Sequence, residues 1–375
     1  MSEKNFKKLK LLFCINSLSA KGGGAEKILS IISKELSDYD KYHISIISFD
    51  NPGRKFFYKF SNKIKIYKLG NLEIFKGRFF KNINRIIIMM IYMFKIKPNI
   101  SFGFMHSNYI NLSFASIFSK SKIVACEHIV PQHFTNKRLE FFLIKLSSFF
   151  FDKISVVSTQ VKKLFPLILQ KKMIVLNNFV DLVDKPHTKQ NRNRFKRILS
   201  VGRLEDQKNF LTLIYAFNVF QQKFNDWKLD IIGDGWQKKN IVKQIKNFKI
   251  EKKIRIINFK KNLNQDYLKS SFYVCSSIYE SFGLTVAEAL LHNLPVIAFK
   301  KCTGVNNIIK HQKNGILINA VYYDYQNLAL AMIKLASNKK LIKQLSNYNN
   351  KKIFEENSKK LVVKKWIRLI NTLSK

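Results

Sequence analysis

Short apolar runs alternate with longer amphipathic segments along the first half of the chain. The short runs favour buried strands and lie at 9–15, 43–49, 63–69, 99–104, 122–126, 154–158 and 174–177. Between them, apolar residues recur at helical spacing over 25–37, 78–95 and 137–151. Strands that alternate with helices in this way are typical of a parallel, doubly wound α/β sheet.

The pattern breaks at a polar, charged stretch after residue 184 and then restarts. New strands are predicted at 197–201, 228–232, 254–257, 272–275 and 295–299, with helices at 210–224, 236–247 and 265–270. A last amphipathic, basic helix follows at 358–373. We therefore predict two α/β domains, which 375 residues can accommodate: 1–184, a linker at 185–196, 197–355, and a C-terminal helix within 356–375.

The chain is strongly basic. Lys and Arg number 67 against 24 Asp and Glu, a formal net charge of +43, while apolar residues make up 46% and can form real cores. Such a charge implies attraction to a polyanion, either nucleic acid or an anionic membrane surface. Heavy use of Lys, Ile, Asn and Phe throughout is equally explained by mutational drift toward AT-rich codons, so composition leaves both explanations open.

Neither a metal site nor a membrane span is predicted. The four cysteines form no Cys-x-x-Cys pair, which fits a reducing cytoplasm, and His128 and His133 have a poor spacing for a helical metal pair. The N-terminus lacks the apolar region of a signal peptide. The longest apolar run, 86–94, falls well short of the roughly 20 residues that a span needs, so we expect a soluble or peripheral protein.

Two carboxylates flank a loop-to-helix junction at 279–290. Glu280 precedes the turn, Gly283 can adopt backbone angles that other residues avoid, and Glu288 lies in the following helix. Thr285 and Glu288 have the spacing of a capping box. A helix N-terminus offers unpaired N–H groups to a phosphate, so the junction is either a capped surface helix or part of a nucleotide site.

Three motifs in order resemble the retaining glycosyltransferases of family 4. They are Val-Gly-Arg-Leu-Glu-Asp-Gln-Lys-Asn-Phe (201–210), Ile-Ile-Gly-Asp-Gly (231–235), and Glu-Ser-Phe-Gly-Leu (280–284) with Glu288. The resemblance covers nearly the whole chain and is densest from 198 to 317. It implies the GT-B fold, two Rossmann-like domains facing each other across a cleft, with the donor bound by the second domain and the acceptor by the first.

The resemblance also implies roles for the second-domain residues. Arg203 and Lys208 match the clamp on the donor diphosphate, where their charges would stabilise the departing nucleoside diphosphate without a metal or cofactor. Glu288 matches the residue that binds the ribose hydroxyls. Glu280 matches a catalytic carboxylate that contacts the transferred sugar and supports positive charge at its anomeric carbon. The phosphate cradle would be completed by backbone N–H groups of Gly283, Leu284 and Thr285.

In the first domain the resemblance implies acceptor-side and catalytic candidates. The turn at Gly22, Gly23 and Gly24 matches a family loop that approaches donor phosphate or acceptor, although a tight strand-to-helix turn explains it as well. His128 matches a histidine that contacts the sugar near the reaction centre, against the ordinary explanation of a structural histidine. Weaker acceptor-side candidates are His106, Asn108 and Glu127.

These expectations combine into one function with two alternatives. The chain would transfer a sugar, with retention, from a nucleoside diphosphate donor to a saccharide or lipid-linked saccharide in bacterial surface polysaccharide synthesis. The enzyme would be cytoplasmic or peripheral at the inner face of the membrane. The alternatives are an epimerase or phosphorylase of the same fold, or a basic polyanion-binding protein. No zinc finger or clustered basic helix supports nucleic-acid binding.

Overall fold

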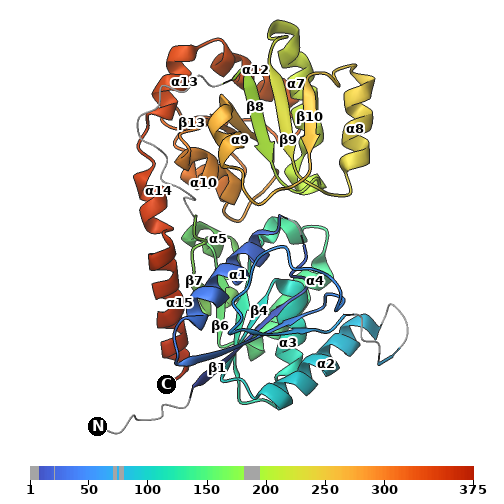
Figure 1. Cartoon of the computed structure of the whole chain (residues 1–375), viewed down its shortest axis with the longest axis vertical. Coiled ribbons are helices and arrows are strands. Elements are labelled where there is room, and N and C mark those ends of the chain that lie inside the picture. Colours follow the sequence, from blue (N-terminus) through green and yellow to red (C-terminus); the bar gives the residue numbers. More distant parts are fainter. Residues whose placement is uncertain (1–7, 21, 71–73, 76–79, 181–194) are drawn as a thin grey trace. The chain divides into compact units, whose positions relative to one another are not determined.

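The computed structural model describes residues 8–20, 22–70, 74–75, 80–180 and 195–375 (Figure 1). The chain divides into two compact units. Unit 1 comprises Met1–Asn178 and Lys360–Lys375, and unit 2 comprises Phe179–Lys359. Most of the predicted linker, 185–194, lies outside the described residues. No helix among the described residues is long and apolar enough to cross a membrane.

Unit 1 is built on a seven-stranded parallel sheet in the order β3-β2-β1-β4-β5-β6-β7. Its strands are β1 (Leu9–Ile15), β2 (Tyr42–Ser48), β3 (Lys65–Lys68), β4 (Ile100–Phe104), β5 (Lys122–Cys126), β6 (Lys153–Val156) and β7 (Met173–Val175). The central strands β1 and β4 are almost wholly buried, because helices cover both faces of the sheet.

The helices of unit 1 follow the strands in alternation. They are α1 (Gly24–Ser37), α2 (Lys81–Ile96), α3 (His106–Ala115), η2 (Pro131–Phe134), α4 (Arg138–Ser147), η3 (Ser148–Phe150), α5 (Thr159–Leu164) and α6 (Leu167–Gln170). The last helix of the chain, α15 (Lys359–Leu373), also packs on this unit. Its Trp366 is buried with its ring centroid 5.3 Å from Phe102 and 6.4 Å from Phe13.

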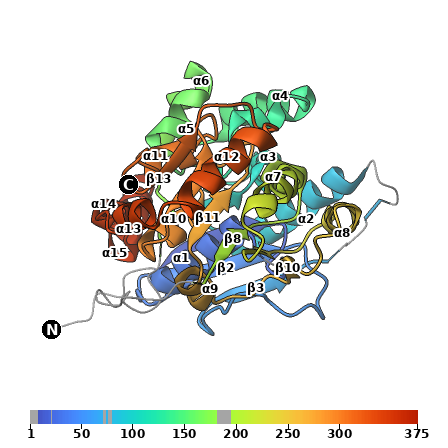
Figure 2. The ribbon, with the colours of Figure 1, turned by 90° about the horizontal axis from the view of Figure 1, so that it is seen from above.

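Unit 2 is built on a six-stranded parallel sheet in the order β10-β9-β8-β11-β12-β13. Its strands are β8 (Arg197–Val201), β9 (Lys228–Ile232), β10 (Ile254–Ile257), β11 (Phe272–Cys275), β12 (Val296–Phe299) and β13 (Gly315–Ile318). Its helices are η4 (Asp206–Lys208), α7 (Phe210–Lys223), α8 (Lys238–Asn247), α9 (Asn264–Lys269), α10 (Leu284–Leu291), α11 (Val305–Ile308), α12 (Tyr325–Ala336), α13 (Lys339–Ser346) and α14 (Lys351–Glu356). Helices α7 and α12 pack side by side (Figure 2).

Two predicted helices differ from the observed ones. The helix expected at 137–151 ends at Ser147 and continues only as the 3₁₀ turn η3, because Phe151 turns to an extended conformation. The helix expected at 78–95 is observed as α2 from Lys81, and residues 78 and 79 lie outside the described part of the chain. Several elements of both units escaped the sequence analysis, notably α3, β13 and α12.

Both sheets reverse their strand order at a defined point. In unit 1 the order reverses between β1 and β4, and in unit 2 between β8 and β11. In open parallel sheets, ligands bind beyond the carboxyl ends of the strands at such a switch point. The segments after β1, β4, β8 and β11 are therefore where site residues are expected.

Candidate functional site

The switch point of unit 2 brings Lys208 and Glu280 into contact. Lys208 ends η4 after strand β8, and Glu280 follows β11. The Lys208 ammonium lies 2.5 Å from Oε1 of Glu280, which also accepts a hydrogen bond from the Ser277 hydroxyl at 2.7 Å. Both charged side chains are nearly buried. Two residues that are 72 positions apart in the sequence thus form one ion pair beyond the carboxyl ends of the central strands.

Cross-hydrogen bonds hold these two loops together. The Gln207 side chain donates to the Tyr279 carbonyl, and the Ile278 amide donates back to the Gln207 carbonyl, both at 2.9 Å. The Ser276 hydroxyl donates to the Lys208 carbonyl at 2.7 Å. The ion pair is therefore held by backbone-anchored contacts on both sides, which fixes its geometry.

Glycines let a third loop approach Glu280. Gly304 adopts φ +79°, and a Cβ built on it would lie 2.6 Å from the Glu280 carbonyl oxygen and 2.8 Å from the Ser281 carbonyl carbon. The Glu280 amide donates to the Thr303 carbonyl at 3.1 Å. The glycines of the 231–235 motif have the same purpose, since Cβ atoms there would collide with the loop after β8. Glycine is needed at these positions because the backbones of neighbouring loops come too close to leave room for a Cβ atom.

Glu288 is held by a buried tyrosine. The Tyr267 hydroxyl donates to its Oε2 at 2.9 Å. The capping box expected for Thr285 and Glu288 is wrong, because α10 begins at Leu284 with Gly283 at the N-cap in the left-handed conformation, φ +81°. The Thr285 hydroxyl bonds instead to the Tyr273 hydroxyl at 2.9 Å.

The N-terminus of α10 is where the phosphate cradle was predicted. Gly283 has no side chain, and the end of the helix has no side-chain cap. The first-turn N–H groups of a helix have no intrahelical partner, so those at Leu284 and Thr285 are oriented for an anion. Arg203, on the loop after β8, is about half exposed and pairs with Glu205 at 3.2 Å, which leaves its guanidinium near the surface.

The glycine turn of unit 1 also lies at a switch point, directly before α1. Gly22 adopts φ +74°, Gly23 occupies the N-cap, and Gly24 begins the helix. No side chain caps this end through a hydrogen bond. The carboxylate of Glu26 folds back over Gly23, within 1.8 Å of where a Cβ would stand, so a side chain at this position would displace the flexible end of Glu26. A carboxylate already lies where the dipole of α1 favours an anion.

His128 rests on an aromatic stack. Its ring lies 5.3 Å from Phe104 and nearly parallel to it, and Phe104 in turn stacks on Trp366 of α15. Burial lowers the pKa of His128 to about 4, so the imidazole is neutral at pH 7. It can therefore donate or accept a hydrogen bond but does not bring a positive charge.

Two acceptor-side candidates have buried side chains. Glu127 accepts hydrogen bonds from the Tyr109 hydroxyl at 2.5 Å and the Ile129 amide at 2.9 Å, and burial raises its pKa to about 7. Asn108 is fully buried and donates to the Phe104 carbonyl at 2.9 Å. Both side chains are buried and hold the loops after β4 and β5.

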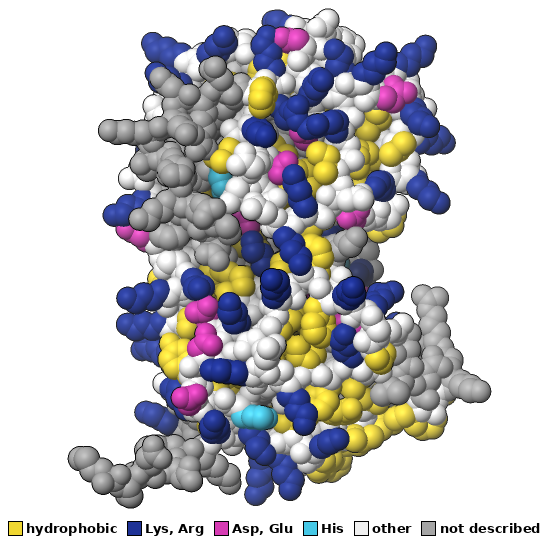
Figure 3. Space-filling model, in the orientation of Figure 1, with side chains coloured by type: hydrophobic (Ala, Val, Ile, Leu, Met, Phe, Trp, Pro, Cys, Tyr) yellow, Lys and Arg dark blue, Asp and Glu magenta, His cyan; other side chains and the backbone are white. Residues whose placement is uncertain are grey.

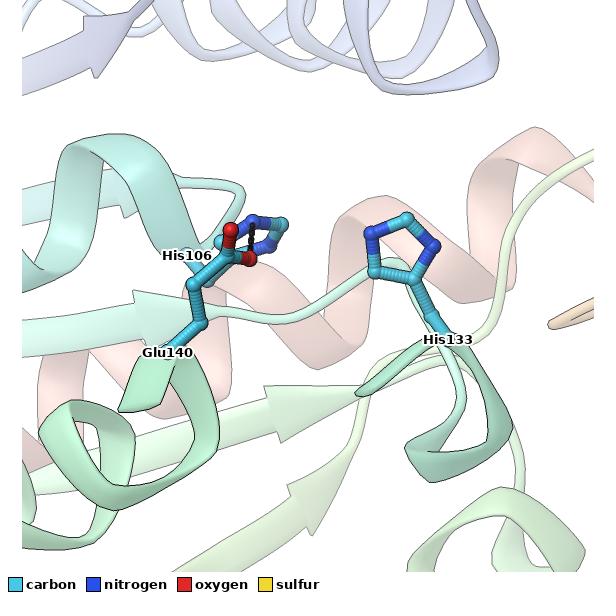
Figure 4. Close-up of side chains that lie close together, drawn as sticks. All are labelled: His106, His133 and Glu140. Atoms are coloured by element: carbon cyan, nitrogen blue, oxygen red, sulfur yellow. Dashed lines mark ion pairs between the residues drawn. The ribbon is translucent and has the colours of Figure 1, made fainter. Parts of the chain in front are cut away.

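The third acceptor-side candidate, His106, belongs to a cluster with His133 and Glu140 (Figure 4). Its Nε2 lies 3.4 Å from Oε2 of Glu140. Burial, together with the charge of Lys137, lowers the pKa of His106 to about 4. The expectation of no metal site considered the four cysteines and the pair His128 and His133, and did not consider that His106, His133 and Glu140 lie close together.

The sequence is similar to those of known glycosyltransferases. Residues 184–352 match the family described as "Glycosyl transferases group 1". The chain is 28% identical to the amylovoran biosynthesis glycosyltransferase AmsD of Erwinia amylovora, over 96% of this chain and 99% of that protein. It is 25% identical, over 79% and 82%, to the N-acetylgalactosamine-N,N'-diacetylbacillosaminyl-diphospho-undecaprenol 4-alpha-N-acetylgalactosaminyltransferase of Campylobacter jejuni.

Solved structures share the fold. The Anabaena protein HepE, crystallised with UDP and glucose, superposes with a TM-score of 0.79 over 97% of this chain and all of that one. Sequence identity is 17%, so this likeness concerns the fold alone. Two parallel Rossmann-like sheets and this neighbour confirm the predicted GT-B fold class.

Proposed function

Starting from a chain that is a group 1 glycosyltransferase, we propose that it is a retaining enzyme of family 4. It would use a nucleoside diphosphate sugar as donor and a saccharide, lipid-linked in its natural setting, as acceptor. The observation that carries the proposal is the contact between Lys208 and Glu280 beside the open N-terminus of α10. A cation, an open helix end and a carboxylate together suit a sugar diphosphate.

Each part of this arrangement has a chemical task. The Lys208 ammonium and the α10 amides would take up the negative charge that grows on the nucleoside diphosphate as the sugar departs, with Arg203 closing from the surface. Glu280, fixed by Ser277 and Lys208, would face the positive charge that develops on the sugar. Glu288, oriented by Tyr267, would accept from the ribose hydroxyls.

Donor binding would need neither a metal nor a resident cofactor. Fixed cationic and N–H groups can neutralise a diphosphate as a divalent ion does elsewhere. In unit 1, neutral His128 would donate a hydrogen bond to the sugar near the reaction centre. The glycine turn at residues 22–24 and His106 would lie toward the acceptor.

The proposed class of acceptor is inferred from the names of similar proteins. AmsD is named for amylovoran biosynthesis, and the Campylobacter jejuni enzyme acts on a diphospho-undecaprenol saccharide. Both are transferases, which favours transfer over an epimerase or a phosphorylase. By this analogy the chain would extend a surface polysaccharide on a lipid carrier.

The exposed side chains of unit 1 are compatible with an acceptor on a lipid carrier. Large apolar side chains stand exposed on and beside α2, α3 and α4, among them Phe94, Phe118, Leu139, Phe142 and Phe149. Figure 3 shows hydrophobic and basic side chains mixed over this unit. Through such a surface the protein would bind peripherally to the inner face of the anionic cytoplasmic membrane.

Ligand-dependent thermal stability tests the donor proposal. The pure protein would be heated with UDP-, GDP-, ADP- and dTDP-linked sugars at millimolar concentration, beside Glu288→Ala and the control Glu251→Ala, an exposed acid of the same unit. A stabilising shift with one nucleotide, kept by Glu251→Ala and lost by Glu288→Ala, is expected. No shift with any of them would count against the transferase proposal.

A further inference from the structure

We propose that His106, His133 and Glu140 form a binding site for one first-row divalent cation, with Zn²⁺ the best match. Each residue offers one ligand atom, and the three atoms lie within 4.8 Å of one another. Two imidazoles and a carboxylate are a common ligand set for zinc, which binds such groups tetrahedrally and keeps a fourth position for water or an oxyanion.

The distances suit a site that tightens slightly on binding. Zinc bonds to nitrogen and oxygen of about 2.0–2.1 Å place tetrahedral ligands roughly 3.3–3.4 Å apart. The distance from His106 Nε2 to Glu140 Oε2 is 3.4 Å. The three ligand atoms together lie within 4.8 Å of one another, and Figure 4 shows the His133 ring facing the pair formed by the other two.

Three separate elements place the ligands. His106 begins α3, directly after Met105, whose φ of 70° and ψ of 149° are almost confined to glycine in other proteins. His133 belongs to η2, and Glu140 to the first turn of α4. Phe134 packs edge-on against both imidazoles, at 5.0 Å and 5.1 Å, and so fixes their planes. The ligands are thus oriented before any ion binds.

An ordinary helix start explains part of this cluster, because acids are favoured in the first turn. It does not explain why Oε2 of Glu140 is screened from solvent yet accepts no hydrogen bond within the part of the chain that the structure describes. A cation already lies there: the Lys137 ammonium is 3.1 Å from His133 Nε2 and 3.9 Å from that oxygen. Lys137 is partly exposed and can swing away, so it would compete with a metal.

The site is distinct from the donor-binding residues of unit 2. Its ligands follow β4 and β5, the strands whose carboxyl ends also lead to His128. A bound cation would add a positive charge to unit 1 that could take an oxygen of an anionic acceptor group. This inference stands even if the proposed transfer reaction is wrong, because its test measures the ion itself.

The test is metal binding by the full-length, tag-free protein after treatment with a chelator. Zn²⁺ is titrated in competition with a chromophoric chelator, and Co²⁺ supplies a visible spectrum that reports tetrahedral coordination. We expect one equivalent of Zn²⁺, with affinity lowered about 10- to 100-fold or more in His106→Ala, His133→Ala and Glu140→Gln. The control His43→Ala, which removes an exposed histidine on β2, should bind as the unchanged protein does.

Lys137→Met separates this proposal from a merely structural cluster. Removing the competing ammonium should raise the Zn²⁺ affinity, whereas a structural role would lower stability and leave ion binding unchanged. Thermal denaturation of every variant shows that it folds. The proposal is overturned if the protein binds no Zn²⁺, if the ligand variants bind as well as His43→Ala, or if Lys137→Met binds no tighter.

Discussion

Replacing Gly304 by alanine should damage the donor site although no charged residue is substituted. The new Cβ would lie 2.6 Å from the Glu280 carbonyl oxygen and 2.8 Å from both the carbonyl carbon and the oxygen of Ser281. All three are backbone atoms, which cannot rotate aside as the end of a flexible side chain can. The loop that carries Glu280 must therefore shift, and with it the contact to Lys208.

The magnitude follows from three contributions. The positive φ of this position costs a non-glycine residue about 1–2 kcal/mol. Overpacking against immobile neighbours costs about 1–3 kcal/mol. The restricted unfolded chain offsets about 0.4–1 kcal/mol of this. We expect a net loss of about 1–5 kcal/mol in the free energy of unfolding, and a loss of donor affinity that exceeds the loss of stability.

Gly53→Ala is the matched control, since a Cβ there meets nothing within 4 Å and its φ is not in the left-handed region. Both variants are compared by chemical denaturation and by titration with the donor nucleotide found in the thermal screen. Gly53→Ala should be as stable as the parent or slightly more stable. If Gly304→Ala matches it in stability and in donor binding, the close approach of the two loops is not as described.

Three more predictions address single contacts. Trp366→Ala should destabilise unit 1 by about 3–5 kcal/mol in chemical denaturation, whereas Leu361→Ala, on the exposed side of the same helix, should cost far less. Tyr267→Phe removes the donor to Glu288 and should weaken nucleotide binding by about 1 kcal/mol, roughly fivefold, in calorimetry; equal affinity would remove Tyr267 from the site. The pKa of Glu127 rises on folding from 4.5 to about 7, so the parent should lose stability relative to Glu127→Gln as pH rises through that window. A difference between those two proteins that stays constant from pH 4 to about 8 would contradict the buried, protonated carboxyl.

The strands were the most predictable part of the fold. The predictions for β1, β5, β8, β9, β10 and β11 match the observed bounds, because a parallel strand that is mostly buried is a short apolar run. Strand β10, at the edge of its sheet, is only partly buried but keeps such a run. Helix α3 gave no comparable signal. It buries Asn108, Asn111 and Ser113 alongside its apolar residues, so no apolar stripe marks its inner face. Strand β13 was also missed, although at four residues it is as long as β10 and β11, so its length does not explain the miss.

The charged residues of the candidate site could be predicted where a sequence motif contains them. The residues that hold those side chains in place could not be predicted. Lys208 and Glu280 were named from family resemblance, yet nothing in the sequence joins them across 72 positions. Ser277 and Tyr267 are ordinary residues until the fold brings their hydroxyls to the two carboxylates. The cluster of His106, His133 and Glu140 was missed for the same reason, since its members come from three separate elements.

The position of α15 has a consequence for how the chain is made. The first strand of unit 1 packs its Phe13 against Trp366, which the ribosome adds only after all of unit 2. The nascent sheet of unit 1 must therefore wait, with part of its apolar surface uncovered, while the whole second unit is synthesised and can fold. Early release of the chain would leave that surface bare, so an interrupted product should be one that chaperones and proteases recognise readily.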